Sequence, residues 1–123
     1  MEKTFRIKQM ASLCGVTAHT LRYYEKINLL VGINRDANGY RCFHEADVEW
    51  IRFLQQLKAT GMPLAQMQQF AELRRQGDHT AAERREMLEQ HRLQVAAQIE
   101  SLNDCLGMID FKIERHRQKE RQG

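Results

Sequence analysis

Four basic residues and a pair of tyrosines occur close together in the first third of the chain. The basic residues are Arg22, Lys26, Arg35 and Arg41, and the pair is Tyr23-Tyr24. Cationic and phenolic side chains bind phosphate oxygens, while polar side chains in the first turn of a short helix can reach base edges in the DNA major groove. A helix with a polar opening turn, followed by a tight turn with arginines beside it, is therefore suited to duplex DNA.

Local signals predict a helix-turn-helix that carries these side chains. A first helix is expected over residues 8–14, and Gly15 allows a turn after it. Thr17 is suited to N-cap a second helix that runs to about Ile27, and Asn28 can take the left-handed C-cap position. Helix, glycine-containing turn and helix is the order found in DNA-binding helix-turn-helix motifs.

A two-stranded wing and a third helix are expected next. Asn38-Gly39 is a strong turn signal within residues 31–43, so this stretch predicts a small β-hairpin. The third helix is expected over 45–59. Its apolar stripe includes Phe53, and Trp50 is expected at the edge of that stripe.

Two more helices follow. Pro63 opens a fourth helix that runs to about residue 75, with Leu64 facing inward. Residues 80–83 have the Thr-x-x-Glu pattern of a capping box, which starts a long helix that continues to about residue 117.

The long helix carries an apolar seam at heptad spacing. Its members alternate by four and three residues: Leu88, Arg92, Val95, Ile99, Leu102, Leu106, Ile109, Ile113 and His116. A lone helix cannot bury such a stripe, so a second copy of the chain is the expected partner, although an intrachain core is an alternative. Arg92 and His116 would face their own kind in a parallel pair, which favours an antiparallel one. The predicted dimerisation residues are Leu88, Val95, Ile99, Leu102, Leu106, Ile109 and Ile113.

Charge and composition narrow the classes of protein to consider. The net charge is +3, and residues 1–75 carry eleven Lys and Arg against seven Asp and Glu, a balance of +4. A polyanion bound there would gain from counterion release. No apolar run approaches the roughly 18 residues of a membrane span, and the first residues have no signal-peptide core. We therefore expect a cytoplasmic protein.

Several motifs together resemble the MerR family of bacterial transcription regulators. They are the string Leu21-Arg-Tyr-Tyr-Glu25, Leu29-Leu30, Arg35, Gly39-Tyr-Arg41 and the turn at Gly61. The resemblance implies a mainly α fold. Residues 1–76 would form a winged helix-turn-helix DNA-binding domain, and residues 77–123 a dimerisation helix with a short tail, paired as an antiparallel coiled coil in a homodimer.

The family also implies a function without catalysis. A dimer would bind an inverted repeat in double-stranded promoter DNA and distort the spacer in response to an effector or stress signal, so that RNA polymerase can use the promoter. The residues that the resemblance assigns to DNA contact are Thr17, His19, Thr20, Arg22, Tyr23, Arg35, Tyr40, Arg41 and Lys58. For His19, an ordinary surface histidine is the alternative.

The three cysteines leave the effector open. They form no CxxC or zinc-finger spacing, and the cysteine positions of the metal-responsive and iron–sulfur branches are absent, so no metal site and no cofactor are expected. Electrophile-responsive members carry one thiol in the helix after the wing, where this chain has Gln56. Cys42, beside Arg41, and Cys105, beside the seam, are the candidate sensor thiols, with a structural role as the alternative for each.

Two rival functions remain. A constitutive architectural or phage-type DNA-binding protein would use the same motifs without an effector. An enzyme or small-molecule binding module is the other rival, but no nucleophilic triad, paired-carboxylate or phosphate-loop signature supports it.

Overall fold

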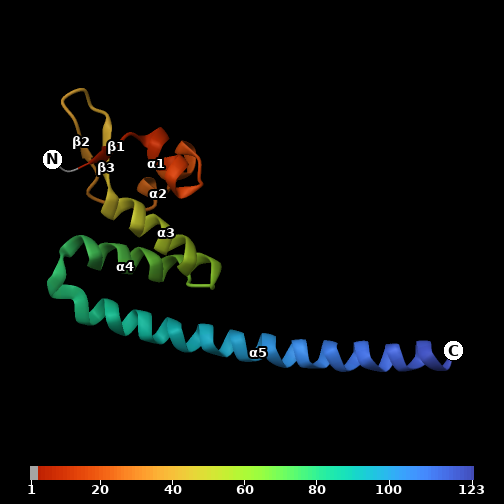
Figure 1. The fold of residues 1–123 in the computed structure, drawn as a ribbon. Helices are drawn as coiled ribbons and strands as arrows, with labels where there is room; N and C mark the ends of the chain where they lie inside the picture. Colours follow the sequence, from red (N-terminus) through yellow and green to blue (C-terminus); the bar gives the residue numbers. More distant parts are fainter. Residues whose placement is uncertain (1–2) are drawn as a thin grey trace. The chain divides into compact units, whose positions relative to one another are not determined.

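The computed structural model describes residues 3–123 and groups the chain into two units, Met1–Met87 and Leu88–Gly123. Figure 1 shows the order of the elements along the chain. They are β1 (Thr4–Phe5), α1 (Ile7–Cys14), α2 (Ala18–Lys26), β2 (Asn34–Arg35), β3 (Arg41–His44), α3 (Glu45–Ala59), α4 (Leu64–Gln76), the 3₁₀ turn η1 (Asp78–Thr80) and α5 (Ala81–Gln122).

The helix-turn-helix is confirmed, with the expected local chemistry. Thr17 caps α2, because its Oγ1 accepts a hydrogen bond of 3.0 Å from the backbone N–H of Thr20. Gly15 ends α1 with φ of 68°, and Asn28 follows α2 with φ of 65°. Both residues adopt the left-handed conformation that Gly, and less often Asn, tolerates.

The wing is confirmed, and the structure adds a strand to it. The sheet has the order β1-β3-β2, and both outer strands run antiparallel to β3. Arg35 lies opposite Arg41 in the hairpin, while Phe5 of β1 lies opposite Phe43 on the other edge of β3. The pairing of β1 attaches the start of the chain to the wing.

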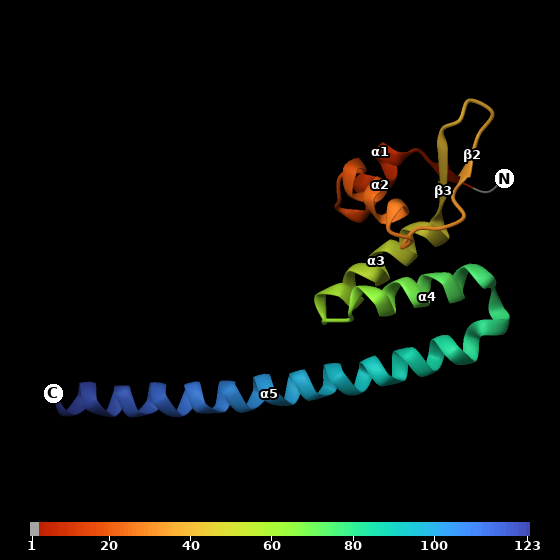
Figure 2. The same cartoon turned by 180° about the vertical axis from the view of Figure 1, so that it is seen from behind.

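Helices α3 and α4 run side by side in both views (Figures 1 and 2), and their core differs from the sequence expectation. Trp50 is buried rather than at an edge: its ring stacks on Phe70 with centroids 5.7 Å apart, and its Nε1 donates to Leu29 O at 2.8 Å. Phe53 and Leu64 are instead 38% and 44% exposed, so the inward positions expected for them were wrong.

The long helix α5 begins where expected but ends later. It contains 42 residues, from Ala81 to Gln122, which at ~1.5 Å per residue make about 63 Å. The Thr80 hydroxyl before it lies 2.6 Å from Leu73 O, to which it donates, and also accepts from Arg84 Nε. Thr80 therefore anchors the start of α5 to the end of α4. No helix among residues 3–123 is long and apolar enough to cross a membrane.

In the second unit, Leu88–Gly123, the predicted seam lies on the helix surface. Ile99, Leu102, Leu106, Ile109 and Ile113 are between 44% and 69% exposed. Such a stripe of exposed large apolar side chains marks an interaction surface.

Candidate nucleic-acid interface

A basic groove lies between helix α2 and the wing. Its cationic lining comes from four places in the first unit: Arg22 from α2, Arg35 and Arg41 from the two wing strands, and Arg6 with Lys8 from the start of α1. Tyr40, which is 61% exposed, lines the groove beside them. Several cations around one groove fit a row of phosphate groups.

Asp36 organises the tip of the wing. Its Oδ1 accepts hydrogen bonds from the backbone N–H groups of Asn38 at 2.9 Å and Tyr40 at 3.0 Å, which forms a side-chain-closed turn. Its Oδ2 pairs with Arg6 Nη1, and this hydrogen bond lowers the pKa of the Asp36 carboxyl and raises the pKa of Arg6. The Arg6 guanidinium also lies over the Tyr40 ring, 5.3 Å from its centroid. Arg6 and Tyr40 are thus held together at the groove.

Glu25 joins α2 to the wing. Arg41 Nε donates to Glu25 Oε2 at 3.0 Å, and Arg35 Nη2 lies 4.0 Å from Glu25 Oε1. Arg35 Nη1 donates to Gly39 O at 2.7 Å, so this side chain also braces the turn. Arg41 is 22% exposed and Arg35 is 50% exposed. The geometry makes Arg41 largely a support between elements and leaves Arg35 more open to a ligand.

The polar side chains in the first turn of α2 differ in their contacts. Thr17 caps the helix, and its Oγ1 lies 3.0 Å from Thr20 Oγ1, so these two hydroxyls contact each other. His19 is exposed on the same turn. The assignment of Thr17, His19 and Thr20 to DNA contact stays a prediction.

Tyr23 and Lys58, the remaining predicted contacts, do not line the basic groove. Both are exposed, at 50% for Tyr23, and they line a separate apolar cavity between α2, α3 and α4. Tyr24, the next residue, is buried, with 8% of its surface exposed. Consecutive tyrosines thus have different roles, as the helical period requires of neighbouring positions.

The sequence reasoning missed two residues of the groove. Arg6 and Lys8 lie where α1 begins, far in the sequence from the wing, and are not among the predicted DNA contacts. The pairing of β1 with β3 brings them to the groove. Their basic character close to Phe5, an apolar residue at the end of a short strand, is the sequence feature that could have indicated them.

The thiols lie in three different environments. Cys14 is buried, and burial raises the pKa of its thiol while Arg52 acts in the opposite sense. Cys42 is half-buried on β3, with its Sγ 3.8 Å from Tyr40 O, and Cys105 is exposed on α5. No group of three or more His, Cys, Asp and Glu side chains within residues 3–123 is placed to hold a metal ion.

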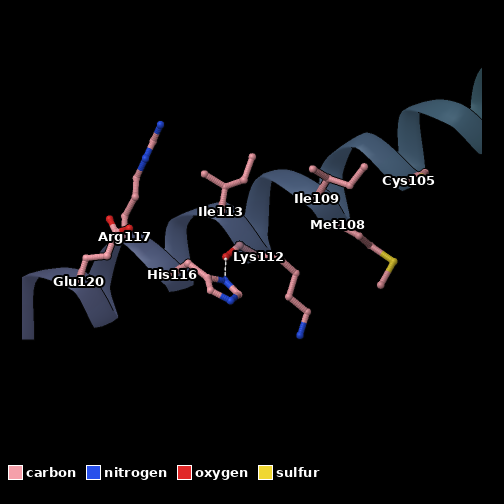
Figure 3. Close-up of a pocket in the computed structure, with 8 residues that line it drawn as sticks. All are labelled: Cys105, Met108, Ile109, Lys112, Ile113, His116, Arg117 and Glu120. Atoms are coloured by element: carbon pink, nitrogen blue, oxygen red, sulfur yellow. Dashed lines mark hydrogen bonds between the residues drawn. The ribbon is translucent and has the colours of Figure 1, made fainter. Parts of the chain in front are cut away.

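The C-terminal part of the seam forms an apolar patch edged by charge. In Figure 3, Ile109 and Ile113 project from one side of α5, and Arg117 follows them one turn later. His116 turns back along its own helix, with Nδ1 2.7 Å from Lys112 O. The apolar side chains are presented together, as a partner helix requires.

Known proteins are similar to this chain over most of its length. A family model described as MerR HTH family regulatory protein matches residues 5–73, and one described as MerR, DNA binding matches residues 48–110. An uncharacterized HTH-type transcriptional regulator of Haemophilus influenzae is 37% identical over 110 residues, which make up 89% of this chain and 82% of that protein.

Two further relatives extend the comparison. The HTH-type transcriptional regulator AdhR of Bacillus subtilis is 34% identical over 86 residues, or 70% of this chain and 61% of that protein. The crystal structure of HiNmlR, a MerR family regulator lacking the sensor domain, bound to promoter DNA, is similar with a TM-score of 0.83 and 35% identity. It covers 94% of this chain and 92% of that one.

Proposed function

This chain belongs to the MerR family of helix-turn-helix regulatory proteins, and from that premise we propose that it regulates transcription by binding promoter DNA as a homodimer in the cytoplasm. The observation that carries the proposal is the basic groove, which joins α2 and the wing into one cationic surface. The promoter DNA bound by HiNmlR, whose fold and length this chain nearly matches, supports the same partner here.

In the proposed complex, α2 lies in the major groove. His19 and Thr20 face base edges from its first turn, while Arg22 and Arg35 bind phosphates on the flanking backbone. Tyr40 and Arg6 continue the contact along the wing. The half-buried Glu25–Arg41 pair links the reading helix to the wing, so both can engage the duplex together.

The proposed dimer forms through the seam of α5 in one antiparallel register. If Leu102 lies opposite the partner's Leu106, then Ile99 lies opposite the partner's Ile109. The middle of the coiled coil then consists of apolar layers. The two polar seam residues then meet each other at the ends, where Arg92 faces the partner's His116. Sliding one helix by a heptad in either direction would set Arg92 or His116 against an isoleucine.

The proposed regulatory mechanism uses two reading heads, one from each subunit, and each head consists of a helix-turn-helix and its wing. Paired heads grip both halves of an inverted repeat, and bending or untwisting the spacer between them costs free energy that the contacts offset. In our proposal an effector shifts the population toward the distorted complex, which RNA polymerase then uses. Cys42 is the candidate sensor thiol, because it lies on the wing strand beside Arg41.

Mutation of Arg22 tests the proposal. We would select duplexes from a random library and measure binding by fluorescence anisotropy at several salt concentrations. Arg22→Ala should weaken binding to selected and unselected duplexes alike and lower the salt slope by about one. Arg121→Ala on α5 removes the same charge outside the groove and should leave the slope unchanged. Identical slopes for the wild type and Arg22→Ala would contradict the assignment of α2.

The constitutive alternative is tested with the same assay. Electrophile treatment should change duplex affinity or spacer distortion in the wild type and leave Cys42→Ser unaffected. A response that survives in Cys42→Ser would remove this thiol from the mechanism, and no response under any treatment would favour a regulator without an effector.

A further inference from the structure

The apolar cavity next to the reading helix has no assigned role. It has a volume of about 280 Å³ and lies between α2, α3 and α4 in the first unit. Its floor consists of buried side chains: Tyr24, Leu29, Leu54, Met62 and Met67 are all no more than 8% exposed. Its rim is open, because Tyr23 and Leu64 are 50% and 44% exposed.

Hydrogen bonds hold the walls of the cavity in place. Gln68 Nε2 of α4 donates to Ile27 O at the end of α2, at 2.8 Å. Trp50 Nε1 of α3 donates to Leu29 O, also at 2.8 Å. Two different helices thus fix the backbone of residues 27–29, so the cavity is formed before any ligand arrives, as is usual for small-molecule sites.

The lining defines the chemistry of a ligand. Among the described residues around the cavity, Lys58 alone carries a formal charge, and it stands at the rim. The remaining lining is aliphatic, aromatic or thioether. A ligand would therefore combine an apolar body with one negative charge.

The volume limits the size of that body. Engineered protein cavities of ~150 Å³ admit a benzene ring, and drug-sized ligands occupy roughly 300–1,000 Å³. A cavity of about 280 Å³ lies between these two sizes, just below the drug-sized range, and suits one or two fused rings.

We propose that the cavity is an effector site for a small aromatic carboxylate, whose rings contact Leu54, Met62 and Met67 and whose carboxylate pairs with Lys58. This inference rests on the proposed function, because an effector can regulate only a chain that binds DNA. Tyr23 and Lys58 are predicted DNA contacts as well as members of the rim, so an occupied cavity takes both away from the phosphate backbone. The ligand and the duplex then weaken each other's binding by the same factor.

Methionine methyl signals test occupancy directly in the full chain. The probe is naphthalene-2-carboxylate, compared with the neutral naphthalene-2-carboxamide, added to protein labelled with ¹³C at the methionine methyls. We expect saturable shifts of Met62 and Met67, tighter binding of the carboxylate than of the amide, and no shift of Met108 on α5. No shift at millimolar probe, or shifts of Met108 in place of Met62 and Met67, would overturn the proposal.

Charge reversal tests the class of ligand. Lys58→Glu should weaken carboxylate binding more than tenfold and leave amide binding within about twofold, whereas Lys119→Glu on α5 should change neither. Because Lys58 is exposed, its reversal leaves the core intact, and the unshifted Met10 signal checks this. If both probes bound equally to all variants, the probe would be an adventitious additive only. That result would overturn the assignment of a carboxylate as the ligand.

A competition experiment tests the coupling. Saturating naphthalene-2-carboxylate should raise the apparent Kd for a selected duplex severalfold in the wild type and not in Lys58→Glu. Unchanged duplex affinity with the cavity occupied would overturn the effector role. If the chain bound no duplex even without the probe, the proposed function would be overturned instead. The methionine shifts would still show whether the cavity binds the probe.

Discussion

Two carboxylates shape a surface that is otherwise basic. Glu25 and Asp36 each bond to arginines that line the groove, and Asp36 also closes the turn at the wing tip. They lower the net positive charge of the surface but hold Arg6, Arg35 and Arg41 in defined positions. Oriented cations contribute more to the affinity for a polyanionic ligand than mobile ones do, because less side-chain freedom is lost on binding.

The pKa of Asp36 reports on the wing in solution. Its pKa is lowered in the folded chain, first by the hydrogen bond from Arg6. A group with a lowered folded pKa contributes stability that is present above its unfolded pKa of about 3.9 and is lost as the pH falls through the lower folded value. Wing order should therefore decline only in the acidic range, below about pH 4.

Arg6→Gln should move the pKa of Asp36 upward, toward its ordinary value, and so raise the pH at which the wing loosens. The bonds from the backbone of Asn38 and Tyr40 remain, so the shift will be partial. An NMR titration of the Asp36 side-chain carbon measures it. Lys3→Gln, which removes a charge without touching Asp36, is the control, and an equal titration curve for Arg6→Gln and the wild type would contradict this account.

At the scale of elements, the sequence predicted what depends on neighbours along the chain. Thr17, Asn28 and Asn38-Gly39 act within one turn of their own positions, so caps and hairpin were confirmed where expected. What depends on distant partners was missed. The inward position of Trp50 is decided by Phe70 and Leu29, and the pairing of β1 with the wing is decided by the contact of Phe5 with Phe43.

The same distinction between near and distant partners explains which residues of the candidate site could be predicted from the sequence. Arg22, Arg35, Tyr40 and Arg41 come together as expected, since a helix and the hairpin that follows it are close in sequence. Arg6 joins them because β1 pairs with β3, and no local pattern indicated this pairing. The apolar cavity was equally invisible to sequence, because its lining comes from three helices whose packing no spacing rule predicts.

The N-cap of α2 gives an element-scale prediction. Thr17→Ala removes the acceptor of the Thr20 N–H and should lower the free energy of unfolding by about 1 kcal/mol, within the range of ~0.5–2 kcal/mol for lost caps. Urea unfolding followed by circular dichroism measures this, and duplex affinity should fall as the first turn of α2 frays. Thr17→Ser keeps the hydroxyl oxygen and serves as the control; equal losses for both variants would argue against the cap.

At the scale of the molecule, the proposed function requires two copies of the chain, and the register of their seam can be tested with the thiol already present. In the proposed antiparallel dimer, the two-fold axis passes close to residue 104, midway between Leu102 and Leu106. Cys105 lies beside this axis and is exposed, so it should face the partner's Cys105. A parallel pair would instead bring every seam residue next to its own copy.

A bismaleimide with a spacer of about 10 Å, longer than a disulfide can span, should therefore link the dimer through Cys105 and yield a covalent species on a denaturing gel. Cys105→Ser should abolish it, since Cys14 is buried and Cys42 lies on the wing. Adding His116→Cys to Cys105→Ser separates the two orientations. The antiparallel register places residue 116 opposite the partner's Arg92, far from its own copy, and predicts no link, whereas a parallel coil predicts an efficient one. Cross-linking at position 116 would thus contradict the register and, with it, the spacing of the two reading heads on DNA.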